Sequence, residues 1–148
     1  MSFTPVAFIQ EDVAFDDSWR KVNEVFIKYS YNAVNNVTYK YSEVNKQFQR
    51  IQKGIVAKDA LNGKELQIKN ILIVEAQHKV IDSSGRRSID IEHGGKGYYI
   101  VDGMLKNIQW KNVDGRIIPY NQDGTEIKYS PGQTWINLVP SLNNVTIK

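Results

Sequence analysis

Cysteine is absent from the 148 residues of the chain, and so is any long hydrophobic run. Without a thiol the chain forms no disulfide and has neither a cysteine nucleophile nor a thiolate ligand for zinc or an iron–sulfur cluster. No stretch approaches the about 20 apolar residues of a transmembrane helix. Pro5, Gln10, Glu11 and Asp12 interrupt the apolar residues at the start, so we expect no secretory signal within them. The length is that of one domain with a real hydrophobic core.

Alanine and leucine are also scarce, and this scarcity favours strands over helices. Together they number 12, whereas isoleucine and valine number 31. Isoleucine and valine branch at Cβ and fit the pleated surface of a sheet, while alanine and leucine favour helices. Eight tyrosines, five phenylalanines and three tryptophans point the same way. The composition therefore predicts an all-β, mainly antiparallel domain.

Turn dipeptides recur along the chain at intervals typical of short strands. They are Asn62-Gly63, Ser84-Gly85, Gly94-Gly95, Asp102-Gly103, Asp114-Gly115, Asp123-Gly124 and Pro131-Gly132. Asn-Gly and Asp-Gly suit type I′ hairpin turns, in which both central residues have positive φ. We expect a β-sandwich or partly open barrel built from hairpins. Residues 1–21 are acidic and lack periodicity, so they are predicted as a lead-in segment, with a single β domain over residues 22–148.

Alternating apolar residues locate the principal strands. Residues 37–42 alternate cleanly and are predicted to pair with residues 48–51 through a turn near residues 43–46. Residues 68–74 form the most continuous apolar run, which predicts a central strand. The best single hairpin is expected around Asp102-Gly103, and further strands are expected at residues 126–129, 134–139 and 145–147.

Few residues offer catalytic or metal chemistry. His78 and His93 are the only histidines, and Asp90 and Glu92 lie beside the second, but no spacing places two ligands on one face. Gly-x-Ser-x-Gly and P-loop motifs are missing. We therefore predict no catalytic residues, no metal and no cofactor. A hydrolase or metal-dependent enzyme that uses His93 with Asp90 or Glu92, or Asp59 with Arg50, remains the alternative.

Aromatic residues are the better candidates for binding. Tyr39 and Tyr41 share one strand face and, with Trp110 and Trp135, could stack sugars, although such rings also fill β-sheet cores. Arg50 and Asp59 are added as candidate ligand-binding residues, with a buried ion pair between them as the alternative.

Positive charge gathers in the first half of the chain. Residues 40–69 contain seven Lys or Arg and three Asp or Glu, a local net charge of +4. Such a stripe attracts anionic polymers, or it is simply a solvated strand face. No arginine cluster exceeds Arg86-Arg87, and we expect no nucleic-acid partner.

A series of short motifs in a fixed order goes beyond composition. The most specific are Trp110-Lys111 and the run Pro131-Gly132-Gln133-Thr134-Trp135-Ile136, preceded by Lys69 to Val74 and by Gly94-Gly95-Lys96-Gly97. Over residues 22–139 the chain resembles the C-terminal domain of the YerB-like lipoproteins of Gram-positive bacteria, a family of unknown function.

This resemblance implies an extracytoplasmic protein that is anchored to the membrane through an N-terminal lipobox and that has a separate N-terminal domain. The sequence contains neither the lipobox nor that domain, so we expect the chain to be the C-terminal part of a longer protein. The resemblance supplies no catalytic residues. The expected function is an uncharacterised binding or structural module of the cell surface, non-enzymatic, whose partners are a cell-wall polymer, another protein or the N-terminal domain. The alternative is the enzyme named above, acting on cell-wall material.

Overall fold

A computed structural model shows an almost entirely β domain, as the composition predicts. The structure describes residues 2–3, 15–29, 36–80, 87–89 and 91–148. The strands are β1 Ser2–Phe3, β2 Trp19–Lys21, β3 Glu24–Ile27, β4 Val37–Ser42, β5 Gln47–Gln52, β6 Ile55–Val56, β7 Ile68–Glu75, β8 His78–Val80, β9 Arg87–Ile89, β10 Gly95–Val101, β11 Met104–Val113, β12 Arg116–Tyr120, β13 Gln133–Val139 and β14 Val145–Ile147. The 3₁₀ helix η2 covers Leu142–Asn144.

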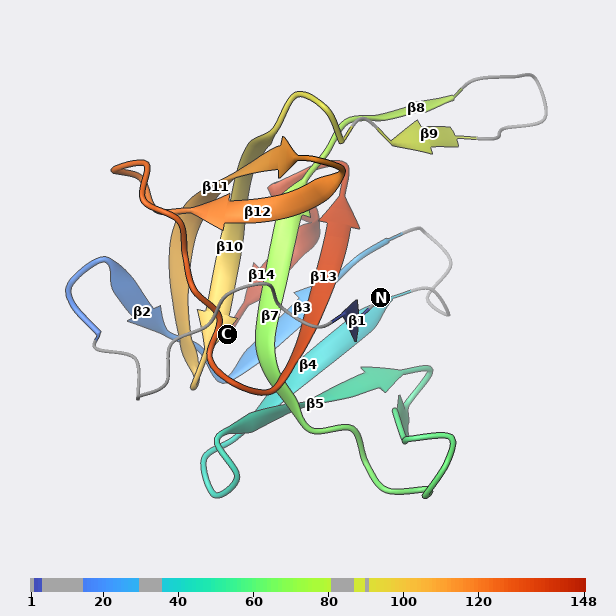
Figure 1. The fold of residues 1–148 in the computed structure, drawn as a ribbon. Coiled ribbons are helices and arrows are strands. Elements are labelled where there is room, and N and C mark those ends of the chain that lie inside the picture. Colours follow the sequence, from blue (N-terminus) through green and yellow to red (C-terminus); the bar gives the residue numbers. More distant parts are fainter. Residues whose placement is uncertain (1, 4–14, 30–35, 81–86, 90) are drawn as a thin grey trace.

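One large sheet curls into a half-barrel, and its neighbours run in the order β12-β11-β10-β7-β5-β4-β3-β14 (Figure 1). Among the described strands eleven of twelve pairs are antiparallel, and six of these join consecutive strands, as expected from the turns. β13 is the exception, because it pairs with β7 in parallel. β2 adds to β11, β6 adds to β5 and β1 adds to β13. β8 and β9 form a separate two-stranded hairpin that projects from the half-barrel (Figure 1).

β7 lies at the centre of the fold, as its apolar run predicts. It pairs with β10 along residues 70–74, with β13 along most of its length, and with β5 at Ile68. Alternate side chains enter two different cores: Ile71 and Ile73 belong to one, and Leu72 and Val74 belong to the other. Both faces of this strand are therefore buried, which explains a continuous apolar run in place of alternation.

Two of the three Asp-Gly dipeptides form the type I′ hairpins that their chemistry predicts, whereas at Asp123-Gly124 and Asn62-Gly63 only the glycine has a positive φ, 91° and 69°. Asp102 and Gly103 have φ values of 52° and 75° between β10 and β11, and Asp114 and Gly115 have 53° and 81° between β11 and β12. Both pairs therefore have the positive φ values of a type I′ turn. Lys53-Gly54, between β5 and β6, has the same pattern, with φ values of 55° and 72°. The sequence did not predict this turn, because Lys53 stands where Asn or Asp usually precedes the glycine.

One other local prediction differs from the structure, and a second is not described by it. Residues 126–129 were expected to be a strand, but Glu126 makes only an isolated bridge to Tyr120. The Ser84-Gly85 turn lies outside the described residues. Residues 48–51 do pair with residues 38–41, with Tyr39 opposite Arg50.

Gly97 is a position where the sheet leaves no room for a side chain. An added Cβ would lie 2.3 Å from the Ile73 carbonyl oxygen and 3.2 Å from Val74 Cα. Because both atoms belong to the backbone of the central strand, the sheet must shift to accept a methyl group. We expect Gly97→Ala to lower the free energy of unfolding by about 1–3 kcal/mol.

Chemical denaturation of the purified variant measures this effect. Gly95→Ala is a milder control in the same strand, since its Cβ would lie 3.0 Å from the nearest backbone atom, the Glu75 carbonyl oxygen. Equal stability of the two variants would contradict the steric argument.

Candidate functional site

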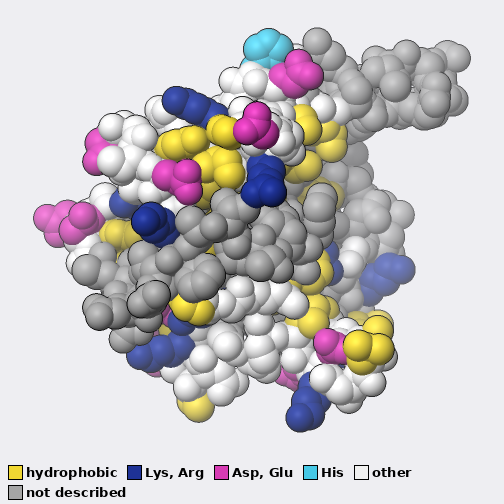
Figure 2. Space-filling view, viewed as in Figure 1, with side chains coloured by type: hydrophobic (Ala, Val, Ile, Leu, Met, Phe, Trp, Pro, Cys, Tyr) yellow, Lys and Arg dark blue, Asp and Glu magenta, His cyan; other side chains and the backbone are white. Residues whose placement is uncertain are grey.

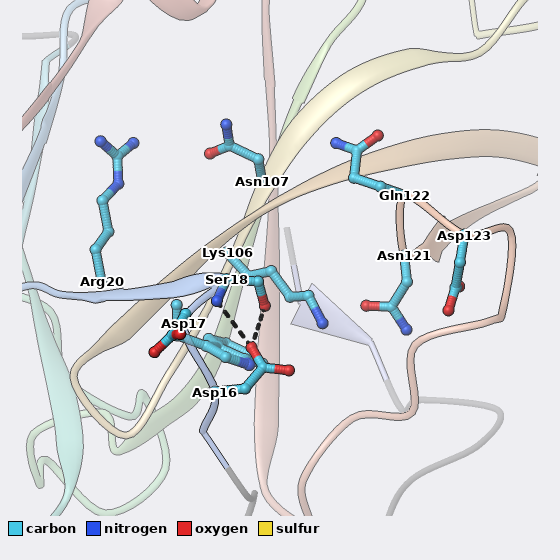
Figure 3. Close-up of a pocket in the computed structure, with 10 residues that line it drawn as sticks. Asp16, Asp17, Ser18, Arg20, Lys106, Asn107, Asn121, Gln122 and Asp123 are labelled. Atoms are coloured by element: carbon cyan, nitrogen blue, oxygen red, sulfur yellow. Dashed lines mark hydrogen bonds between the residues drawn. The ribbon is translucent and has the colours of Figure 1, made fainter.

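A polar groove opens where β2 meets β11 and where the loop after β12 turns back. β2 pairs with the start of β11, Met104 to Lys106, and the loop begins at Asn121 beyond β12. The groove has a volume of about 560 Å³. Its lining, most of it labelled in Figure 3, comprises Asp16, Asp17, Ser18, Trp19, Arg20, Lys106, Asn107, Asn121, Gln122 and Asp123.

Two aspartates at opposite sides of the groove are held by the turns that contain them. Asp16 Oδ1 accepts hydrogen bonds from the backbone N–H of Ser18, at 2.8 Å, and from its hydroxyl (Figure 3). Asp123 Oδ1 accepts them from the N–H of Thr125, at 3.0 Å, and from its hydroxyl, at 2.6 Å. These side-chain and backbone hydrogen bonds lower the pKa of both carboxyl groups, and the charge of Lys106 adds to the effect.

Lys106 is thus a cation that acts on both acidic turns. Its ammonium nitrogen lies 5.1 Å from the centre of the Trp19 ring, within the range of a cation–π contact. The edges of Phe15 and Tyr99 meet the same ring, at centroid distances of 5.0 and 5.9 Å. These contacts hold the Trp19 ring in place, and the ammonium group of Lys106 lies over the face of this ring.

Side-chain amides complete the lining. Gln122 Oε1 accepts a hydrogen bond from Gln109 Nε2 at 3.2 Å, and Asn121 Nδ2 donates to Thr125 Oγ1 at 3.0 Å. Asn107 is exposed on β11. An amide group both donates and accepts, so three of them suit a ligand with hydroxyl or peptide groups.

Two of the four aromatic residues predicted to bind ligand lie in the core. Tyr39 is fully buried, and its hydroxyl donates to Asn137 Oδ1 at 3.0 Å. Trp110 is also buried, and its indole N–H donates to the Glu75 carbonyl oxygen at 2.9 Å. Neither ring faces solvent, so neither can stack a ligand in this conformation. The alternation of β4 and β11 indicated two faces correctly, but it did not say which face is covered. Both rings lie on the covered face, while Lys40, Gln109 and Lys111 lie on the exposed one.

The other two are half-buried and already have neighbours. Tyr41 packs against Phe48, with ring centroids 5.1 Å apart, and lies against Gly103. The ring of Trp135 carries the guanidinium of Arg50, whose Cζ lies 4.8 Å from the ring centroid. Tyr41 and Trp135 thus keep partial access to solvent on the side of the core that contains Tyr39.

Arg50 and Asp59 have separate roles, and the ion pair considered between them is not among the ion pairs of the described residues. Arg50 donates to Gln52 Oε1 at 3.4 Å in addition to its contact with Trp135. Asp59 Oδ1 accepts hydrogen bonds from the backbone N–H groups of Leu61, at 2.7 Å, and Asn62, at 3.3 Å. Asp59 therefore shapes its own turn.

Metal-binding clusters and membrane-spanning helices were sought in the described part of the chain. There, no group of three or more His, Asp or Glu side chains is placed to hold a metal ion. The side chain of His78 and the whole of Asp90 lie outside the described residues. Glu92 and His93 are exposed. None of the helical segments described could cross a bilayer.

Sequence reasoning missed the groove. Residues 16–20 were noted only as part of an acidic lead-in segment, and residues 121–123 only for the Asp123-Gly124 turn. About a hundred residues separate the two segments, and they share a site because β2 adds to β11 while β12 folds back from it. The one sequence signal for the groove is that polar residues are dense at residues 16–18 and 121–123.

Comparison with known proteins identifies relatives. A family model described as the C-terminal domain of DUF3048, a protein of unknown function, matches residues 25–136. "Putative lipoprotein YerB" of Bacillus subtilis is 42% identical over 116 residues, which are 78% of this chain and 35% of that protein.

A crystal structure of the YerB protein from Bacillus subtilis is similar with a TM-score of 0.81 and 37% identity, over 97% of this chain and 47% of that one. The chain thus spans between about a third and a half of the relatives it matches. The β11 and β12 side of the groove lies within residues 25–136, and the β2 side lies before them.

Proposed function

The chain belongs to the DUF3048 C-terminal domain family, and on this premise we propose that it is a non-enzymatic binding module of an extracytoplasmic, membrane-anchored lipoprotein. Its ligand is a cell-wall polymer of the Gram-positive surface, and the polymer binds in the groove above Trp19 and Lys106. The observation that carries the proposal is the lining itself, in which amides, carboxylates and two cations surround a cavity of about 560 Å³.

Peptidoglycan carries hydroxyl, amide, carboxylate and ammonium groups, and the groove offers a counterpart to each. Asn107, Asn121 and Gln122 can donate to and accept from hydroxyl and amide groups. Asp16 and Asp123 are acceptors for ammonium and hydroxyl groups. Arg20 and Lys106 suit a ligand carboxylate. A few convergent polar groups in a concave site are typical of specific ligand recognition.

The ionisation of the two aspartates favours binding over hydrolysis. A glycosidase needs one carboxylic acid whose pKa is raised, so that it can protonate the leaving group. The hydrogen bonds from Ser18 and Thr125 lower the pKa of Asp16 and Asp123 instead. Both groups are therefore acceptors at neutral pH, and neither is a proton donor.

Removing the amides tests the groove directly. We expect the double variant Asn107→Ala and Gln122→Ala to bind soluble peptidoglycan fragments about 5- to 150-fold more weakly, because each lost hydrogen bond contributes about 0.5–1.5 kcal/mol. Titration followed by Trp fluorescence measures the dissociation constant, since Trp19 lines the groove.

Gln67→Ala removes an exposed amide outside the groove and serves as the matched control. Co-sedimentation with purified sacculi at low and high salt extends the test to the intact polymer. Unchanged affinity of the double variant, or no binding by the native chain in either assay, would overturn the proposal. The search would then turn to protein partners and to the part of the longer relatives that this chain does not span.

A further inference from the structure

Three aliphatic side chains stand almost free of the protein in the turns and loop at the two ends of β5. Leu61 is 97% exposed, Val44 is 94% exposed and Ile55 is 67% exposed. Val44 lies in the turn between β4 and β5, Ile55 begins β6, and Leu61 lies in the loop after β6. In Figure 1 the β4–β5 turn and that loop both project at the lower end of the molecule, away from the rest of the sheet.

Hydrogen bonds within each turn hold these side chains outward. The Asp59 carboxylate accepts from the N–H of Leu61, and the Asp59 carbonyl oxygen accepts from the N–H of Gly63 at 2.9 Å. The turn that contains Val44 is closed by the N–H of Lys46, which donates to the Ser42 carbonyl oxygen at 2.8 Å. The exposure of Val44 and Leu61 thus results from ordered turns.

Lysines surround the aliphatic tips. Four of them are exposed in the same turns and loop: Lys46, Lys53, Lys58 and Lys64. Of the nearby acids, Glu43 lies 3.8 Å from Lys21, Glu65 accepts a hydrogen bond from Gln49, and Asp59 is directed into its own turn. Figure 2 shows hydrophobic, basic and acidic side chains side by side at this lower end.

We propose that this end, formed by Val44, Ile55 and Leu61 with the four lysines, docks on an anionic lipid bilayer. Three exposed side chains on separate turns do not form a pocket for a small ligand, but they can contact a flat surface at the same time. Aliphatic side chains that enter the interface, with lysines against the headgroups, are the two contributions that bind peripheral proteins to anionic membranes. The turns and loop of this end, residues 43–46 and 53–65, carry four lysines and three acids, a net charge of +1 with the sign that such a surface attracts.

Vesicle co-sedimentation of the chain tests this proposal, with phosphatidylglycerol–phosphatidylcholine vesicles compared with pure phosphatidylcholine. We expect binding to the anionic vesicles that weakens with salt, and much weaker binding to the neutral ones. Lys58→Gln with Lys64→Gln should weaken binding about 25-fold at low salt. The triple variant Val44→Ser, Ile55→Ser and Leu61→Ser should weaken it at least about tenfold.

Matched controls remove the same chemistry elsewhere. Val113→Ser replaces an exposed aliphatic residue on β11, and Lys96→Gln with Lys128→Gln removes two exposed charges outside this end. Both controls should bind as the native chain does, and so should the groove variant Asn107→Ala with Gln122→Ala. Circular dichroism confirms that every variant is folded.

Three results would overturn the proposal. The first is equal binding to neutral and anionic vesicles, or binding to neither. The second is full affinity of the serine variant for anionic vesicles, which would indicate a site for polyanions that uses charge alone. The third is an equal loss in the control variants. The groove variant is measured separately with peptidoglycan. A failure of membrane binding therefore leaves the proposed polymer site in place, and a failure of polymer binding leaves the membrane proposal in place.

Discussion

Replacing Trp110 by alanine is expected to lower the free energy of unfolding by about 3–5 kcal/mol. The side chain is 1% exposed and belongs to the core cluster that also contains Leu72, Val74 and Tyr99. The change opens a large cavity beside the central strand, and it leaves the Glu75 carbonyl oxygen without the indole donor. Since whole domains are stable by only about 5–15 kcal/mol, this loss brings the fold close to unfolding at ordinary temperature.

Denaturant unfolding of purified protein measures the effect. Val113→Ala, in the same strand but 42% exposed, is the control and should stay within about 0.5 kcal/mol of the native chain. Trp110→Phe keeps a ring and loses the hydrogen bond, so it should fall between the two. If Trp110→Ala proves as stable as the control, the ring is not part of the core, and the stacking role that the sequence suggested for it becomes open again.

Alkaline pH should unfold the domain steeply through its buried tyrosines. Burial raises the pKa of Tyr29, Tyr39, Tyr99 and Tyr129 well above the ordinary value of 10.0. Below pH 10 these groups are neutral in both the folded and unfolded states, and stability is complete. Above it the unfolded chain releases their protons while the folded chain retains them, so stability falls with rising pH.

Each such tyrosine contributes about 1.4 kcal/mol of lost stability per pH unit, and four together contribute roughly 5 kcal/mol per unit. We therefore expect cooperative unfolding between about pH 11 and 12, with tyrosinate absorbance rising in the same step. Gradual ionisation while the circular dichroism stays native would contradict this account, because it would show that the hydroxyls reach solvent in the folded state.

Tyr129→Phe and Tyr99→Phe separate ionisation from hydrogen bonding. The Tyr129 hydroxyl is buried and has no hydrogen-bond partner in the described part of the chain, whereas the Tyr99 hydroxyl donates to Asn70 Oδ1 at 2.6 Å. Each variant should reduce the alkaline slope by about a quarter. At neutral pH only Tyr99→Phe should lose stability, by about 1 kcal/mol. An equal neutral-pH loss in both would show that Tyr129 has a partner after all.

The candidate site was far less predictable than the fold. Tyr39, Trp110, Tyr41 and Trp135 all lie on strands, as expected, but a period of two says only that a residue points to one of two faces. Here β4 and β11 are covered on one face only, since Lys40, Gln109 and Lys111 are exposed, whereas β7 places alternate residues in two cores. Which face meets solvent is decided by what packs on it, and that depends on strands distant in sequence.

The sequence by itself determined the elements whose physics is local. Asp102-Gly103 and Asp114-Gly115 make tight hairpins because their backbones tolerate positive φ, and the β-branched residues between such turns specify strands. The apolar run from Ile71 to Val74 specified a strand buried on both faces.

Only the tertiary structure decided what depends on distant partners. β13 joins β7 in parallel some 65 residues away in sequence. That contact brings Asn137 to the hydroxyls of Tyr29 and Tyr39. β2 joins β11, and this pairing brings Asp16 and Asp123 to opposite sides of one groove. Such pairings follow from the burial and hydrogen bonding of the whole sheet, which no local pattern contains.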